Sequence, residues 1–173
     1  DSSTSRGLGD VYKRQQEIKI GYEFFQNVDE LNDTEKKLFE TAKSAREKAY
    51  APYSNFLVGC ALLLDNGEII SGNNQENAAF PSGLCAERST IFWTAANFPK
   101  EKILKIFVIG GPKDFTEKSI AIPPCGACRQ SISEYEVKQR SDIEIYFASM
   151  SGEVYKTSSV RDLLPFSFDA SYL

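Results

Sequence analysis

A nine-residue apolar run, FLVGCALLL at residues 56–64, most constrains how this chain can fold. An apolar run of this length next to turn residues is typical of a buried strand. The run leads directly into DNGE at residues 65–68, and Asn-Gly at the centre of such a stretch favours a tight hairpin turn. Residues 69–72, IISG, then supply the returning strand. The sequence therefore predicts a sheet that begins with a β-hairpin.

Helices are predicted on both sides of this hairpin. Residues 32–50 carry apolar side chains at helical spacing, and Asp33 or Thr34 is the expected N-cap. Two later helices are predicted, one over residues 85–96 and one from residue 125 to about residue 135.

Three further apolar runs predict strands later in the chain, at residues 102–111, 143–149 and 154–158. A turn at Ser151-Gly152 separates the last two. Strands that pair first through a hairpin and later through helices indicate an α/β fold. In such a fold, helices cover both faces of a mixed sheet.

The composition fits a single enzyme domain. The chain has 173 residues, of which 42% are hydrophobic, and can bury one core. Its net charge of −4 offers no basic surface for a nucleic acid polymer, and no stretch has the apolar length of a membrane span. Residues 1–17 are polar and aperiodic and are expected to be a cloning leader, so that residues 18–173 form the domain. The expected location is cytoplasmic.

Three cysteines lie where helices are predicted to begin. Cys85 opens one helix, and Cys125 and Cys128 form a C-x-x-C pair at the start of another. Free N–H groups and the helix dipole favour thiolate there, and three thiolates suit a Zn²⁺ that keeps one position for water. Two other interpretations remain open: a redox-active C-x-x-C pair, or a closed structural zinc site with Cys60 as fourth ligand. If Cys60 is no ligand, we expect it to be an inert core residue.

Glu87 stands two positions after the first of these cysteines. Alone, it would be an ordinary first-turn glutamate stabilised by the helix dipole. Next to zinc, it could take the proton of a bound water, whose pKa falls towards ~7, and pass that proton on. Zinc deaminases combine a Cys-x-Glu stretch with Pro-Cys-x-x-Cys. Both occur in this chain, as Cys85-Ala86-Glu87 and Pro124-Cys125-Gly126-Ala127-Cys128.

With these motifs, the sequence resembles the cytidine deaminase family of free-nucleoside enzymes over about residues 34–168. Four blocks carry the resemblance: YSNFLVGCALL, GNNQENAAFPSGLCAER, PPCGACRQ and LLPFSF. It implies a three-layer α/β/α fold with a five-stranded mixed sheet, and a homotetramer with its sites at subunit junctions. It also implies zinc-dependent hydrolytic deamination of cytidine and 2′-deoxycytidine to uridine and 2′-deoxyuridine plus ammonia, in pyrimidine salvage.

The resemblance assigns the metal chemistry to five residues. Cys85, Cys125 and Cys128 would hold one Zn²⁺ per chain, and Glu87 would shuttle protons. Arg88 would donate to the ligand sulfurs and so offset the negative charge that three thiolates leave on the site.

The resemblance also implies a set of substrate contacts. Asn74 and Glu76 would hold the ribose hydroxyls, which suits an amide and a carboxylate facing a vicinal diol; a polar hairpin loop is the alternative. Phe56 would pack against the pyrimidine, or else be a core phenylalanine. Phe168 would reach the site of a neighbouring subunit, or else bury the chain end. Ala86 is also expected to contact the substrate.

Two positions depart from the family pattern. Cys60 stands where alanine is common, a change expected to stay within the core. Phe80 occupies a position often held by tyrosine, so it lacks a hydroxyl that could meet the nucleoside or a neighbouring subunit.

Three rival functions follow from the same residues. One is deamination of another aminopyrimidine nucleoside, such as blasticidin S. A polynucleotide deaminase is disfavoured by the acidic composition and by the lack of a basic, aromatic-rich groove. A non-catalytic zinc-stabilised module would keep its metal and bind no nucleoside.

Overall fold

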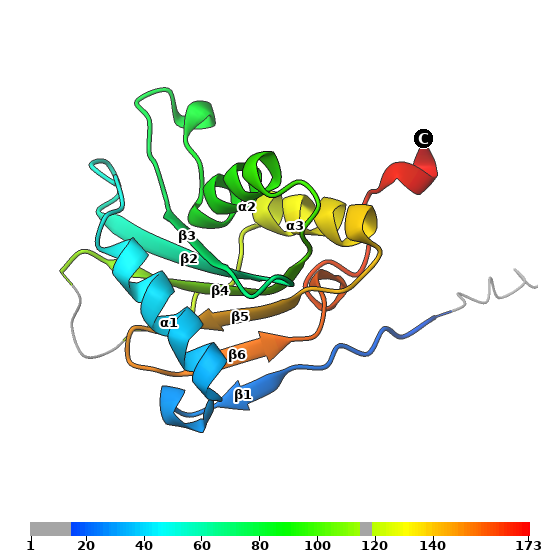
Figure 1. The fold of residues 1–173 in the computed structure, drawn as a ribbon, viewed down its shortest axis with the longest axis horizontal. Coiled ribbons are helices and arrows are strands. Elements are labelled where there is room, and N and C mark those ends of the chain that lie inside the picture. Colours follow the sequence, from blue (N-terminus) through cyan, green and yellow to red (C-terminus); the bar gives the residue numbers. More distant parts are fainter. Residues whose placement is uncertain (1–14, 115–118) are drawn as a thin grey trace, which may run out of the picture.

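The computed structural model describes residues 15–114 and 119–173 and forms a three-layer α/β/α structure. One helix covers one face of a mixed sheet, and two helices lie side by side on the other face (Figure 1). The expected α/β/α class is therefore confirmed. In chain order the elements are β1 (Glu23–Phe25), α1 (Asp33–Arg46), β2 (Phe56–Leu64), β3 (Ile69–Asn73), α2 (Ala86–Asn97), β4 (Ile103–Pro112), α3 (Gly126–Gln139), β5 (Glu144–Ala148) and β6 (Val154–Thr157), with short 3₁₀ turns between them.

The sheet has the order β1-β6-β5-β4-β2-β3. The predicted hairpin is present as β2 and β3, and β4 runs antiparallel to β2 and parallel to β5. Gly67 and Gly152 have φ angles of 87° and 102° at the two predicted turns, a conformation that glycine adopts at little cost. The mixed pairing follows from the connections, because the β4–β5 crossover contains α3 whereas the antiparallel pair β5–β6 needs only a turn.

The sheet has six strands, one more than the five that were expected. The additional strand β1 pairs antiparallel with β6 and forms an edge of the sheet. It has three residues, and its Phe24 ring lies 4.9 Å from the Tyr155 ring of β6. So short a strand depends on pairing with a distant part of the chain, and the local pattern before residue 32 did not reveal it.

The N-cap of helix α1 lies at least one residue earlier than predicted, and the helix ends at Arg46, before residue 50. Asn32 is its N-cap, where the sequence had favoured Asp33 or Thr34. The Asn32 side chain accepts a hydrogen bond from Glu35 N at 3.0 Å, and Glu35 accepts one from Asn32 N at 3.2 Å. This reciprocal capping box satisfies two backbone donors that would otherwise be free, which explains why Asn32 prevails.

The packing of α1 on the sheet requires a glycine in β2. A Cβ atom built on Gly59 would lie 1.9 Å from the carbonyl oxygen of Ala42, a distance that no side chain tolerates. Glycine thus lets the helix backbone approach the strand directly.

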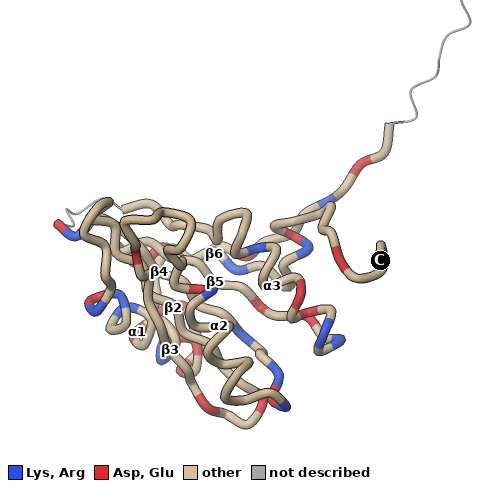
Figure 2. The backbone as a smooth tube through the Cα atoms, turned by 90° about the horizontal axis from the view of Figure 1, so that it is seen from above, with Lys and Arg blue, Asp and Glu red and all other residues tan. Residues whose placement is uncertain are grey.

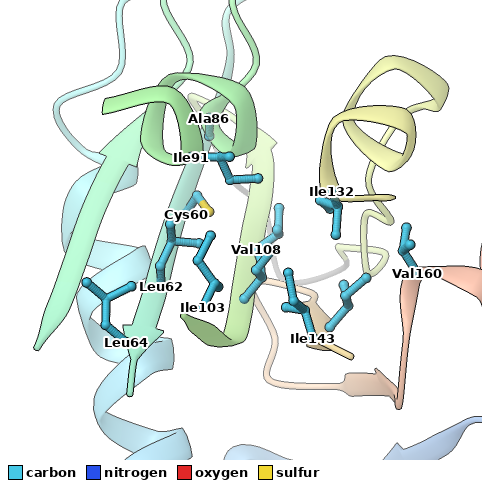
Figure 3. Close-up of a cluster of buried hydrophobic side chains, with 12 residues drawn as sticks. Cys60, Leu62, Leu64, Ala86, Ile91, Ile103, Val108, Ile132, Ile143 and Val160 are labelled. Atoms are coloured by element: carbon cyan, nitrogen blue, oxygen red, sulfur yellow. The ribbon is translucent and has the colours of Figure 1, made fainter. Parts of the chain in front are cut away.

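The core beneath α2 and α3 fixes the two helices that carry the cysteines. Side chains from β2, β4 and β5 meet Ala86 and Ile91 of α2 and Ile132 of α3 (Figure 3). Cys60 of β2 lies in this cluster with no exposed surface. The helix starts therefore rest on a close-packed layer, in which even a small change in side-chain volume disturbs the packing.

Residues 1–14, most of the expected leader, lie outside the described residues. Residues 15–17 are exposed and belong to no helix or strand, and the assignment of 1–17 as a leader stays a prediction. Within the described residues, no helix combines the length and apolar character needed to cross a membrane.

Candidate active site

Three sulfur atoms meet where α2 and α3 begin. Cys85 is the N-cap of α2 and Cys125 is the N-cap of α3, so both helices begin where the sequence predicted, and Cys128 lies in the first turn of α3. Cys85 Sγ is 3.8 Å from Cys125 Sγ, which is 3.5 Å from Cys128 Sγ, and all three atoms lie within 4.8 Å of one another. Tetrahedral zinc with Zn–S bonds of about 2.3 Å places its sulfur ligands about 3.8 Å apart. The donor set and its spacing thus fit Zn²⁺.

The surroundings favour a thiolate at Cys85. An interaction with the Cys128 thiol is the largest cause that lowers the pKa of Cys85 to about 5, although burial acts in the opposite direction. The positive charge of the Arg88 guanidinium lowers this pKa further. The same interaction raises the pKa of Cys128. Cys60 is not part of the three-sulfur cluster.

Glu87 lies beside the cysteines and is almost completely enclosed. It is the second residue of α2, and only 4% of its surface is exposed. Burial raises the pKa of its carboxyl group, and the charge of Cys85 raises it further. A carboxyl group that is partly desolvated and borders a cleft is a strong candidate for proton transfer.

A cleft of about 640 Å³ opens next to the cysteines and Glu87. Its volume lies within the range for small-molecule sites. Four segments form its walls: the loop before β2 with part of that strand, the loop after β3, the start of α2, and the chain before α3, with one residue of β4. The lining residues are Tyr53, Ser54, Val58, Asn74, Gln75, Glu76, Asn77, Phe80, Gly83, Leu84, Cys85, Glu87, Arg88, Val108, Ile122, Pro123 and Cys125.

Asn74 is fixed against the backbone of β2. Its Oδ1 accepts a hydrogen bond from Val58 N at 2.8 Å, and its Nδ2 donates to Phe56 O at 2.9 Å. The side chain lines the cleft and cannot swing freely. Each group retains capacity for a further hydrogen bond.

Glu76 is fixed by the loop before β2. Its Oε2 accepts hydrogen bonds from Tyr53 N at 2.9 Å and from Ser54 N at 3.3 Å. The Ser54 hydroxyl is the largest cause that lowers the pKa of this carboxyl group, and the Tyr53 N–H lowers it further. Glu76 is thus held in the cleft wall with its carboxyl group favoured in the ionised form.

Three of the predicted substrate contacts do not line the cleft. Phe56 is half-buried in β2 and lies near Gly110 of β4. Ala86 is completely buried in the core beneath α2. Phe168 is 59% exposed near the chain end, where its ring stacks on Tyr172 at 5.6 Å. Their roles towards a substrate stay predictions.

The cleft lining contains an aromatic pair, Tyr53 and Phe80, of which the sequence singled out only Phe80, as a departure from the family pattern. The Tyr53 and Phe80 rings meet edge to face at 5.9 Å and join the two loops on either side of the opening. Phe80 is 75% exposed. Tyr53 and Ser54 fall within the YSNFLVGCALL block, which is the signal that could have identified them.

The sequence profile of the cytidine and deoxycytidylate deaminase zinc-binding region matches residues 32–141. A cytidine deaminase of Halalkalibacterium halodurans is 38% identical over 133 residues, which cover 77% of this chain and 92% of that protein. A cytidine deaminase of Sporosarcina psychrophila is 39% identical and covers 79% and 94% of the two chains. The crystal structure of cytidine deaminase from Burkholderia pseudomallei superimposes with a TM-score of 0.66 at 42% identity, covering 76% of this chain and 97% of that one.

The fold and the three-sulfur site are thus those of the zinc-binding deaminase class. The chain belongs to the cytidine and deoxycytidylate deaminase family, and the expected enzyme class, cytidine deaminase, is confirmed.

Proposed function

We propose that this enzyme catalyses the zinc-dependent hydrolysis of cytidine and 2′-deoxycytidine to uridine and 2′-deoxyuridine, with release of ammonia. The observation that carries the proposal is the position of Glu87. A nearly enclosed carboxyl group lines a nucleoside-sized cleft together with two cysteines of a zinc-like sulfur cluster. The names of the related proteins support the same substrate.

Cys85, Cys125 and Cys128 would hold one Zn²⁺ per chain. When bound there, zinc supplies a Lewis acid that makes a water molecule acidic enough to react near neutral pH. Arg88 would offset the negative charge on Cys85, because the positive charge of its guanidinium favours the thiolate. A less electron-rich ligand leaves the metal a stronger Lewis acid. Tuning the metal in this way is the role expected of Arg88, which is not itself a ligand.

Glu87 would move the protons of the reaction. It accepts a proton from the attacking water and delivers it to N3 of the pyrimidine. It then takes the proton of the new C4 hydroxyl and gives it to the amino group, which leaves C4 as ammonia while the carbonyl forms. Water thus supplies the oxygen of the product carbonyl, one hydrogen to N3 and one hydrogen to ammonia. The raised pKa of Glu87 supports this role, since a carboxyl group that both gains and loses protons should titrate closer to neutrality.

Asn74 and Glu76 would hold the sugar. Both side chains line the cleft in orientations fixed by backbone hydrogen bonds, so little side-chain entropy remains to be lost on binding. Ala86 would contact the substrate through its position at the start of α2. Phe56 would pack on the base, and Phe168 would complete the site of a neighbouring subunit in a homotetramer.

A free nucleoside suits this cleft better than a polynucleotide. Among the described lining residues Arg88 is the only cation, and the chain carries a net charge of −4. A polymer would bring a row of phosphates that needs several basic contacts. The proposal places the enzyme in pyrimidine salvage in the cytoplasm.

The test is a loss of cytidine absorbance on incubation with the purified, zinc-loaded enzyme. We expect turnover of cytidine and 2′-deoxycytidine, its loss after chelation, and its return when zinc is added back. Parallel incubations with blasticidin S and with a cytosine-containing single-stranded oligonucleotide test the two rival substrates. Faster turnover of either one would reassign the substrate. Bound zinc with no nucleoside turnover would indicate a zinc-stabilised module instead.

A further inference from the structure

An apolar arm leads into β1, and its side chains remain largely exposed in the described part of the chain. The arm comprises residues 18–24, and it alternates apolar residues with Lys19, Gly21 and Glu23. Residues 18–22 belong to no strand, and Figures 1 and 2 show this segment leaving the body of the domain as a single extended chain. The apolar side chains are exposed by 54%, 51%, 64% and 45% at Ile18, Ile20, Tyr22 and Phe24.

Where the arm joins the sheet as β1, one face of the arm is aromatic and the other is charged. On one face, the rings of Tyr22 and Phe24 lie 5.8 and 4.9 Å from the ring of Tyr155, which stacks on Phe147 at 5.4 Å. On the other face, Glu23 forms an ion pair with Lys156 at 3.0 Å. Side chains i and i+2 share a face of an extended chain. The alternation of residues 18–24 therefore continues the apolar face and the charged face of β1 along the arm.

The outer edge of β1 is open. It pairs with β6 on one side and with no described strand on the other. An apolar sheet edge of this kind readily accepts another strand. The open backbone edge of β1 therefore suits a partner that is itself an extended chain.

The sequence of the arm is complementary to itself. We propose that the arms of two copies of this chain pair antiparallel about a two-fold axis at Gly21, joining two sheets edge to edge. This register places Ile18 opposite the partner's Phe24 and Ile20 opposite the partner's Tyr22, on one face. On the other face it places Lys19 opposite the partner's Glu23.

Symmetry and charge favour a second copy over an unrelated strand. Each contact across a two-fold axis occurs twice, so the single pairing of Lys19 with Glu23 gives two opposite-charge pairs. Glu23 is 59% exposed on its side chain despite its bond to Lys156, and so can accept a second cation. A Cβ atom added to Gly21 would have nothing within 4 Å, and glycine at the axis permits close approach of two backbones. The arm also lies outside residues 32–141, the region shared with the family.

A cysteine at the axis tests the pairing. Opposed residues of an antiparallel pair have Cα atoms about 4.5–5.5 Å apart, within the span of a disulfide. We expect the zinc-loaded Gly21→Cys variant to form a covalent dimer under mild oxidation at micromolar concentration. The matched control is Asn66→Cys, which places an exposed cysteine in the β2–β3 turn and should remain mostly monomeric on a non-reducing gel.

A charge reversal tests the register. In the Gly21→Cys background, Lys19→Glu would place carboxylates opposite each other and should slow cross-linking several-fold, whereas Lys100→Glu, an equal charge change at an exposed site, should not. Cross-linking of Gly21→Cys no faster than that of Asn66→Cys would overturn the proposal. So would cross-linking that is insensitive to Lys19→Glu.

Discussion

Cys85 Sγ and Cys125 Sγ lie 3.8 Å apart, although 40 positions separate the two residues in the chain. Each is the N-cap of a different helix, and neither side chain caps its own helix. Two helix dipoles therefore direct their positive ends at one cluster of sulfurs, where they stabilise thiolates. The convergence of α2 and α3 builds the metal site, and Glu87 follows Cys85 closely enough to share it.

The three-sulfur cluster predicts how metal content responds to mutation. Cys125→Ala should lose its zinc, because two sulfurs cannot complete the site. Cys60→Ala should retain about one zinc per chain, since Cys60 is buried in the core and outside the cluster. Metal analysis of the two purified variants checks this. An empty site in a folded Cys60→Ala variant would favour the closed four-cysteine site.

Substitution of Glu76 should weaken nucleoside binding. Glu76→Ala removes a carboxylate held in the cleft wall by two backbone N–H groups, and we expect KM for cytidine to rise by on the order of tenfold to a hundredfold. Steady-state kinetics measure the change. Glu47, whose side chain is 63% exposed and which does not line the cleft, offers a control that should leave KM unaltered as Glu47→Ala. Equal KM values in the two variants would contradict a role of Glu76 in nucleoside binding and would favour the polar hairpin loop.

Glu136 should anchor α3 to the residues just before β5 and just after β6. Its carboxylate is buried and accepts hydrogen bonds from Ile143 N at 2.9 Å, Ser159 Oγ at 2.8 Å and Val160 N at 3.0 Å. Glu136→Ala would leave these donors buried without partners, so the free energy of unfolding should fall by on the order of 3 kcal/mol. Urea denaturation measures the loss. Glu134→Ala, an exposed change on the same helix, should cost far less, and a similar loss in both would contradict the account.

Acid should weaken the contact between α1 and the sheet. Burial raises the pKa of Glu35, but hydrogen bonds from Tyr146 at 2.7 Å, from Asn32 N and from Lys105 outweigh it and hold the pKa below 4.5. A lowered folded-state pKa stabilises the protein fully above about pH 4.5, and this stabilisation disappears as the pH falls through the folded value.

The difference in unfolding free energy between the wild type and Glu35→Gln should therefore be largest near neutral pH. It should shrink as the pH falls below about 4.5. Denaturation of both proteins across this range tests the expectation, with the exposed Glu40→Gln as a control whose small effect should not vary. A difference that stays constant down to pH 3 would show that the ionised carboxylate contributes nothing.

Local patterns predicted those parts of the fold that local interactions determine. The β2–β3 hairpin follows from its Asn-Gly turn, and both cysteine-bearing helices begin where the sequence placed them. The Asn32 cap was missed because Asp33 and Thr34 are also good capping residues, and only the contact with Glu35 decides between them. β1 was missed because its stability comes from β6, far along the chain.

The candidate site was predictable to the extent that its residues lie in short motifs. The spacing within the motifs was enough to group the three cysteines with Glu87. The motifs did not reveal that Tyr53 and Ser54 hold Glu76, because that contact joins two loops. Phe168 lies away from the cleft of its own chain, so its predicted contact depends on a second subunit.

The central claim is that Glu87 moves protons for the deamination. Glu87→Gln keeps the size of the side chain and its ability to form hydrogen bonds, so the fold and the three sulfurs should persist. The variant loses the carboxylate that accepts and returns protons, and general acid–base catalysis typically contributes 10²–10⁴-fold.

The most direct measurement is kcat for cytidine in Glu87→Gln, taken together with the zinc content and Tm of the same preparation. Because one carboxylate serves several proton transfers, we expect kcat to fall by on the order of 10⁴-fold while zinc content and Tm change little. A variant that keeps its zinc and more than about a tenth of wild-type turnover would contradict the mechanism, since so small a loss lies well below the contribution of a proton-transferring group.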